Sequence, residues 1–96
     1  MPKSKTLRIR PKANADLSEI YEYSYREFGS RRADQYIRQL DVAFQSLVDE
    51  LALGNDYSHI RPDLKGYSVV SHVVFFKRTD YGVNILRVLH KSMDYG

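Results

Sequence analysis

The apolar residues of this 96-residue chain change their spacing once, and that change limits the folds open to it. Between residues 13 and 51 apolar side chains recur every three or four positions, which predicts helices. Between residues 67 and 89 the chain is rich in valine, isoleucine and aromatic residues with a period of two, which predicts strands. A chain of this length buries roughly 65% of its unfolded surface, enough for one core. We therefore expect a single domain, residues 1–96, in which helices pack on a sheet.

A strand is expected at residues 5–10, before the helical part. Leu7 and Ile9 would lie on one face and Arg8 and Arg10 on the other, and Pro11 would close the strand. A first helix is expected over 13–27. Its predicted apolar stripe consists of Ala13, Leu17, Ile20, Tyr21 and Phe28.

The predicted first helix has an acidic outer face that includes Asp16 and Glu19, near its positive end. Gly29 is expected to end this helix, and Ser30 to cap a second helix that runs to residue 51. Because the link between the helices is so short, they should form an antiparallel hairpin.

After a connecting loop at 52–66, three strands are expected at 67–70, 72–78 and 83–89, with a turn at 79–82 between the last two. The predicted fold class is α+β. It consists of an N-terminal strand, an antiparallel two-helix hairpin and a three-stranded antiparallel meander, with the helices on one face of the sheet.

Composition excludes several classes of protein. Without cysteine the chain can form neither disulfides nor thiolate metal sites. No apolar run approaches the roughly 20 residues that cross a bilayer, and the N-terminus lacks a signal-peptide core. We therefore expect a cytoplasmic protein that does not contact a membrane.

The net charge of +3 is unevenly distributed. Residues 1–12 carry five basic and no acidic side chains, residues 13–56 carry four basic and nine acidic, and residues 57–96 carry six basic and three acidic. This asymmetry indicates a basic surface for an anionic partner, either nucleic acid or an acidic protein segment. The charge alone does not decide between the two.

Three histidines are the first candidates for chemistry. His59, His72 and His90 do not stand at ligand spacing from one another or from a carboxylate, so we predict no metal site and no cofactor. His72 is expected to be structural. His90 could act as a general acid only with a substrate within hydrogen-bond reach.

The cations of the second half allow three interpretations: solvated strand residues, a phosphate-holding site that cleaves RNA, or a docking groove for an acidic or amphipathic peptide. These cations are Arg61, Lys65, Lys77, Arg78, Arg87 and Lys91. In the first helix Tyr21 should face the core, whereas Tyr23 and Tyr25 point elsewhere and either mark an interface or edge the core.

Several short motifs follow one another along the chain. They are the strand ending at Pro11, ADLSEI at 15–20, Phe28-Gly29, Ile60-Arg61, Gly66-Tyr67, SHVVFFKR at 71–78 and RVLHKSMD at 87–94. Together they resemble the ParE toxins of bacterial toxin-antitoxin modules, within the wider RelE/ParE superfamily. The last motif is the most specific.

The resemblance implies a toxin that inhibits DNA gyrase and blocks DNA replication, with no catalytic centre of its own. It implies neutralisation by a ParD-like ribbon-helix-helix antitoxin whose flexible C-terminal segment wraps the toxin, and roles in plasmid maintenance and stress response. Operator DNA would be reached only through the antitoxin complex, and the assembly would be a toxin homodimer or a toxin-antitoxin hetero-oligomer.

Two sets of contact residues are predicted on this basis. The candidates for contact with gyrase are Arg87, His90, Lys91, Met93 and Asp94. The candidates for contact with the antitoxin are Arg61, Arg78, Arg87, Tyr23 and Tyr25.

The alternative is the RelE branch of the superfamily, whose members cut mRNA on the ribosome with basic side chains and a tyrosine or histidine near the C-terminus. The matching residues here would be Arg61, Lys65, Arg78, Arg87 and His90. RelE-like nucleases usually carry more lysine and arginine, and Phe76 and Leu89 stand where further polar groups would be sought. A plain nucleic-acid-binding module is a third hypothesis, but the sequence has no helix-turn-helix or zinc-finger signature.

Overall fold

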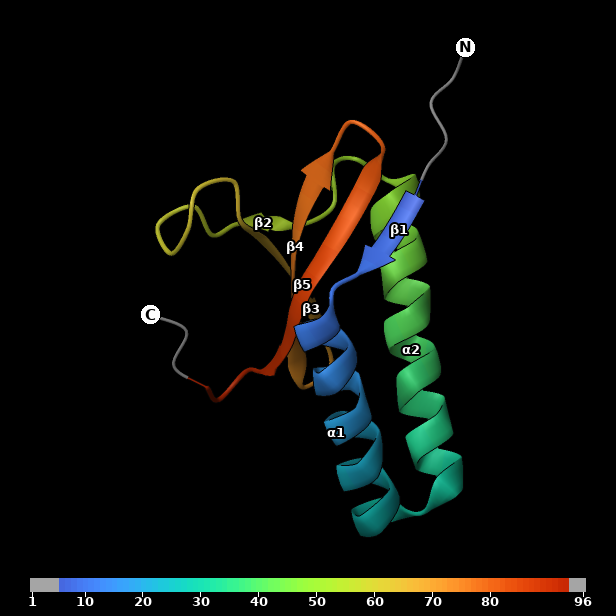
Figure 1. Cartoon of the computed structure of the whole chain (residues 1–96). Coiled ribbons are helices and arrows are strands. Elements are labelled where there is room, and N and C mark those ends of the chain that lie inside the picture. Colours follow the sequence, from blue (N-terminus) through green and yellow to red (C-terminus); the bar gives the residue numbers. More distant parts are fainter. Residues whose placement is uncertain (1–5, 94–96) are drawn as a thin grey trace.

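Strand β5 (Gly82–His90) organises the sheet, because it pairs with the strand before it and with the first strand of the chain. The computed structural model describes residues 6–93, and Figure 1 shows a helical hairpin packed on one face of the sheet. The other elements are β1 (Thr6–Ile9), α1 (Pro11–Phe28), α2 (Ser30–Asp49), β2 (Asn55–Asp56), β3 (Lys65–Val69) and β4 (His72–Thr79). The strand order is β1-β5-β4-β3-β2.

The predicted α+β class is confirmed, and the sheet is larger than the expected meander. β1 pairs parallel with the first half of β5, from Thr6 opposite Gly82 to Ile9 opposite Ile85. β2 lies inside the expected loop and adds a short antiparallel edge to β3. A β-bulge interrupts the pairing of β4 with β5: Phe76 lies opposite Ile85, whereas Phe75 lies opposite Arg87. Leu86 is the extra residue.

Gly82 is required where β1 meets the β4–β5 turn. Its φ is +151°, and an added Cβ would lie 2.0 Å from the carbonyl oxygen of Thr6. The same turn is closed by Thr79, whose hydroxyl oxygen accepts hydrogen bonds from the N–H groups of Tyr81 and Gly82. The predicted turn at 79–82 is therefore confirmed.

The helix boundaries correct two predictions. Pro11 is the first residue of α1, where its fixed φ and missing N–H cost nothing, so it begins the helix as well as following the strand. Gly29, with φ of +89°, lies between α1 and α2 and serves as the N-cap of α2. Ser30 is therefore the first residue of α2 and not its cap.

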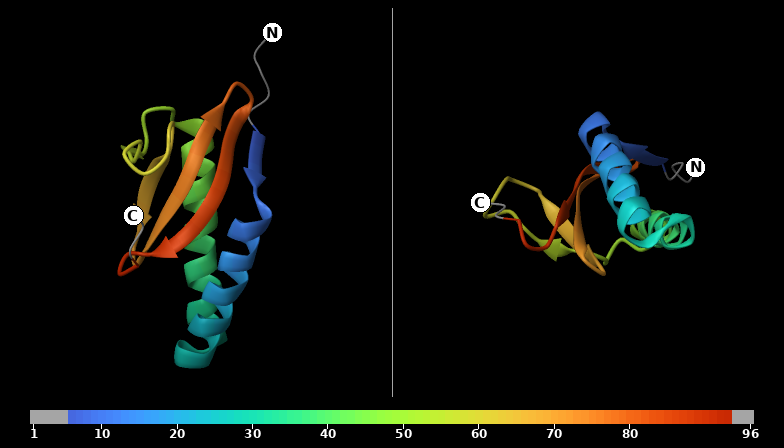
Figure 2. Two further views of the ribbon diagram at one scale, coloured as in Figure 1. Left: turned by 60° about the vertical axis from the view of Figure 1, so that its left-hand side comes forward. Right: turned by 90° about the horizontal axis from the view of Figure 1, so that it is seen from below.

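The main core lies between the hairpin and the sheet. Its most deeply buried side chains are Leu40, Phe44, Leu47, Val74, Phe76, Val83 and Ile85. The prediction that Tyr21 and Phe28 face this core was wrong, because they are 36% and 61% exposed. The hairpin extends beyond the sheet, so its free end has no sheet to pack on (Figures 1 and 2).

A second, smaller core lies on the sheet face away from the helices. It is formed by Leu64, Val73 and Phe75. Tyr57 and Ile60 of the segment that follows β2 pack against it, so this segment covers part of the outer face. None of the helices in residues 6–93 carries an apolar stretch long enough to cross a membrane.

Candidate functional site: a groove beside the helical hairpin

A groove of about 930 Å³ lies between the overhanging hairpin, the β3–β4 turn and the end of β5. Its apolar lining includes Ile20, Tyr23, Phe28, Val70, Leu89 and Met93. Tyr23, Phe28, Val70 and Met93 are each more than half exposed. Exposed apolar side chains that converge on one hollow are typical of a binding surface, whereas scattered ones are not.

The buried carboxylate of Asp16 forms one wall of this groove. Its Oδ2 and Oδ1 atoms accept hydrogen bonds from Nε and Nη2 of Arg87 at 2.8 and 2.9 Å. Oδ2 also accepts the backbone N–H of Val88 at 2.9 Å. These bonds tie α1 to β5 and raise the pKa of Arg87 further above its ordinary value.

The location of Asp16 corrects the prediction that it belongs to an acidic outer face. It is 8% exposed. The signal was present in the sequence, because Asp16 stands three residues after Ala13 and four before Ile20, the other two buried residues of α1. That spacing places a carboxylate on the apolar stripe itself.

Arg87 binds Asp16 with one edge of its guanidinium and keeps further N–H donors for another partner. A guanidinium offers five N–H groups in a planar fork, and Asp16 occupies one edge of it. The Arg87 side chain lines the groove and is 41% exposed. It can therefore bind a second carboxylate in the groove while it remains paired with Asp16.

Tyr36 fixes the β3–β4 turn to α2 at the floor of the groove. Its Oη atom lies 2.6 Å from Nδ1 of His72, 3.2 Å from the carbonyl oxygen of Val69 and 3.3 Å from the N–H of Ser71. The carbonyl oxygen of Val69 can only accept a hydrogen bond, and the backbone N–H of Ser71 can only donate one. All three bonds therefore form together when the Tyr36 hydroxyl donates to Val69 and accepts from Ser71 and from a proton on Nδ1 of His72. Burial raises the pKa of Tyr36, which keeps this hydroxyl protonated.

His72 and His90 face each other across β4 and β5. They form a directly opposed pair, with ring centroids 5.2 Å apart in an edge-to-face arrangement. Burial, followed by the nearby His90, lowers the pKa of His72, and Asp16 opposes this with a smaller effect. His72 is therefore neutral at pH 7 and structural, as predicted. His90 lies close to Ser92, with Nδ1 2.7 Å from Oγ.

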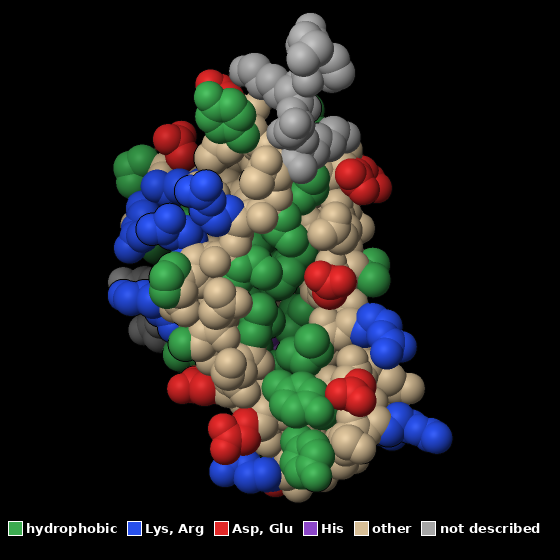
Figure 3. Space-filling model, turned by 45° about the vertical axis from the view of Figure 1, so that its right-hand side comes forward, with side chains coloured by type: hydrophobic (Ala, Val, Ile, Leu, Met, Phe, Trp, Pro, Cys, Tyr) green, Lys and Arg blue, Asp and Glu red, His purple; other side chains and the backbone are tan. Residues whose placement is uncertain are grey.

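The structure separates the predicted antitoxin residues. Tyr23 and Arg87 line the groove. Arg61 is exposed in the segment after β2, and Tyr25 lies beside Tyr21, with ring centroids 6.3 Å apart. On the face of the hairpin that Figure 3 shows, hydrophobic side chains follow the line between the two helices to the free end of the hairpin.

Arg78 points inward and holds the end of α2. Its guanidinium donates to the carbonyl oxygens of Leu47, Glu50 and Leu53 at 2.8–3.0 Å, and it lies over the ring of Phe76. Burial lowers its pKa. The structure thus gives Arg78 a structural role that the sequence did not reveal.

The predicted gyrase-contact residues gather at the end of β5. Arg87, His90 and Met93 line the groove, and Lys91 is exposed beside them. Asp94 lies outside the described residues.

The cations that a nuclease site would need are dispersed. Arg87 and His90 share the groove, whereas Arg78 is bound to the end of α2, and Lys65 is on β3 opposite Asp56. Within residues 6–93, no three His, Asp or Glu side chains are placed to hold a metal ion.

Comparisons with known proteins decide the family. The family model described as "ParE toxin of type II toxin-antitoxin system, parDE" matches residues 7–95. The chain belongs to the ParE toxin family. It is similar to Toxin ParE1 of Mycobacterium tuberculosis, with 34% identity over 87 residues that cover 90% of this chain and 89% of that protein. Toxin ParE1 of Caulobacter vibrioides is 33% identical over 90 residues, which cover 94% of this chain and 93% of its own.

A solved structure supports the fold. The structure titled "Chromosomal ParDE TA system from P. aeruginosa" matches with a TM-score of 0.77 and 19% identity, over 90% of this chain and 95% of that one. The resemblance stated from the motifs is therefore confirmed: this is a ParE-type toxin of a type II toxin-antitoxin system, and an antitoxin partner follows from that.

We predict that Asp16→Ala destabilises the toxin by about 2 kcal/mol, because it strips partners from a charged guanidinium and from a buried N–H group. Urea unfolding followed by circular dichroism measures the change. Glu19→Ala, an exposed acid one turn along α1, is the matched control and should cost less than about 0.5 kcal/mol. Equal losses of unfolding free energy in the two variants would show that the hydrogen bonds of Asp16 to Arg87 and Val88 do not stabilise the fold.

His72 should make stability depend on pH. Because its folded pKa is lowered, the neutral form stabilises the fold fully above the unfolded pKa of about 6.5, and this contribution is lost as pH falls below it. The free energy of unfolding should therefore drop between pH 6.5 and 5, and His72→Gln should flatten that drop. An unchanged slope in the variant would contradict this assignment.

Proposed function

We propose that this toxin inhibits DNA gyrase and thereby blocks DNA replication, and that a ParD-like antitoxin neutralises it by occupying the groove. Membership of the ParE family supports the choice of target, together with the motif at 87–94, whose described part forms the end of β5 and the groove wall. Inhibition of this kind needs no proton transfer, because a protein that binds one state of gyrase more tightly shifts its cycle toward that state. In this proposal gyrase supplies the DNA-cleaving chemistry.

The groove carries the antitoxin part of the proposal. Its apolar lining is exposed and includes residues of α1 from Ile20 to Phe28, and Arg87 in its wall retains hydrogen-bond donors. These features fit an amphipathic segment that places apolar side chains against Tyr23 and Phe28 and a carboxylate against Arg87. A ribbon-helix-helix antitoxin with a flexible C-terminal segment would supply such a chain, ordered only on binding.

The experiment that tests the target adds purified toxin to gyrase supercoiling and cleavage assays, with a ribosomal translation reaction in parallel. We expect loss of supercoiling and accumulation of cleaved plasmid, with intact mRNA. Codon-specific mRNA cleavage with unaffected gyrase would overturn the proposal and place the toxin with the ribosome-dependent nucleases.

Two neighbouring tyrosines of α1 test the groove. Tyr23 and Tyr25 are similarly exposed, at 57% and 52%, but only Tyr23 lines the groove. Tyr23→Ala should weaken antitoxin binding about tenfold, the effect of losing a buried aromatic anchor of about 1.4 kcal/mol, whereas Tyr25→Ala should leave it unchanged. Titration calorimetry with the antitoxin encoded beside the toxin measures both. Equal effects would place the interface on the outer helix face instead.

A further inference from the structure

The two layers of the fold differ in their balance of charge. The strands β1, β3, β4 and β5 contain basic residues and no acidic ones. The helices α1 and α2 contain seven acidic and five basic residues between them. The basic N-terminal segment seen in the sequence thus joins a sheet whose strands are mostly basic. Neither the residues of β1 nor Lys77 line the proposed groove.

The register of the sheet aligns cations across three strands. Arg8 of β1 lies opposite Asn84 of β5, and Asn84 lies opposite Lys77 of β4. Their neighbours Val83, Ile85 and Phe76 are buried in the core under the helices. Since side chains alternate along a strand, Arg8, Asn84 and Lys77 occupy the opposite, outer face.

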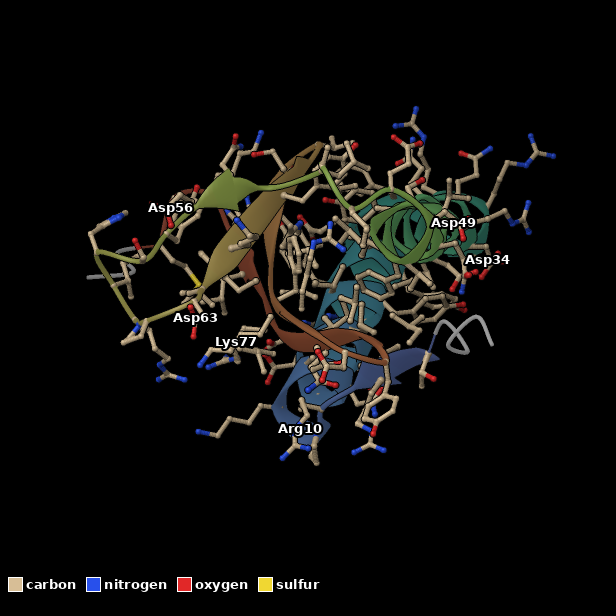
Figure 4. The ribbon with its side chains drawn as sticks, turned by 90° about the horizontal axis from the view of Figure 1, so that it is seen from above. Arg10, Asp34, Asp49, Asp56, Asp63 and Lys77 are labelled. Carbon is tan, nitrogen blue, oxygen red and sulfur yellow. The ribbon has the colours of Figure 1, made fainter. Side chains whose placement is uncertain are left out.

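Arg10 extends this row at the end of β1. It stands two residues after Arg8 and is exposed. Seen from above, Arg10 and Lys77 lie away from Asp34 and Asp49 of α2, and Asp63 lies on the same side as Lys77 (Figure 4). We call Arg8, Arg10, Lys77 and Asn84 the basic row.

The cations of the basic row are not neutralised by the described part of the chain. Within residues 6–93 the ion pair that forms is that of Arg87 with Asp16. Arg8 and Arg10 are exposed and Lys77 is partly exposed. Three cations gathered without counter-charges repel one another, so an anion bound here relieves that repulsion.

The shape of this face favours a phosphate backbone over a peptide. The apolar outer residues Val73 and Phe75 are covered by the segment around Ile60 and Leu64, and the basic row lies outside that cover. β5 is paired on both sides along this row, and the strand edge that is open there is that of β1, which offers an acidic peptide only four residues to pair with. The row contains no aromatic side chain on which single-stranded bases could stack.

We propose that the basic row is a contact surface for the phosphates of duplex DNA. Lys and Arg bind phosphates without reading sequence, and their affinity comes from the counterions that the DNA releases. The amide of Asn84, between Arg8 and Lys77, adds a neutral hydrogen-bond donor to the same surface. The toxin would then touch DNA through one end of its sheet while the groove between the hairpin and the end of β5 remains available.

The test measures fluorescence anisotropy of a labelled duplex of about 20 base pairs with the toxin alone, at several salt concentrations. Three phosphate contacts predict a slope of about −2.7 in log affinity against log salt, or roughly a 20-fold loss between 50 and 150 mM. The Arg8→Gln/Lys77→Gln double variant should reduce the slope to about −0.9. Circular dichroism checks that each variant is folded.

The matched control removes the same charge from the helical layer. Arg31→Gln/Arg38→Gln changes two exposed arginines of α2 and should leave the slope within error of the unmodified toxin. No binding at low salt, an equal loss in the control, or tighter binding of a polyglutamate peptide than of the duplex would each overturn the proposal. Because free DNA is the probe, the outcome is independent of any assay on gyrase.

Discussion

The carboxylate of Asp16 completes the edge of β5, and the arrangement of the two layers depends on it. β1 covers that edge only as far as Ile85, whose carbonyl oxygen accepts the N–H of Arg10 as the chain turns into α1. Beyond this point a side chain replaces the missing strand, because Asp16 accepts the N–H of Val88 and holds Arg87. A buried carboxylate is favourable only when its partners are in place, so this contact fixes where α1 lies on the sheet.

The order of elements could be predicted because it rests on local periodicity, which changes once along the chain. Contacts between distant residues could not. The pairing of His72 with His90 requires the bulge at Leu86, since the turn at 79–82 alone would place His72 opposite Leu89. Nothing in the sequence marks that extra residue. The sequence predicts a loop for the segment after β2, because Tyr57, Ile60 and Leu64 are scattered among turn residues, although all three pack on the outer face.

The sequence likewise predicts only part of the candidate site, because local motifs are visible in it and contacts between distant residues are not. The motif at 87–94 includes Arg87, His90 and Met93, which the structure brings together in the lining of the groove at the end of β5. The sequence gives no reason to distinguish Arg78 from Arg87. In the structure, however, the guanidinium of Arg78 donates to three carbonyl oxygens at and just after the end of α2. Exposed and inward-pointing arginines have the same sequence signature on a strand, and only the packing of α2 separates them.

The bulge at Leu86 decides what each end of β5 presents. It lets Ile85 and Val88 both face the helices although they stand three residues apart, and it puts Arg87 at the outer side of the strand. If the same residues paired without the bulge, the facing of everything after Leu86 would be reversed, which would bury an arginine and turn Val88 outward. Over evolution, loss of the extra residue between Ile85 and Val88 should be tolerated, because both residues would still face the helices, whereas a shift to regular pairing of all four should not be.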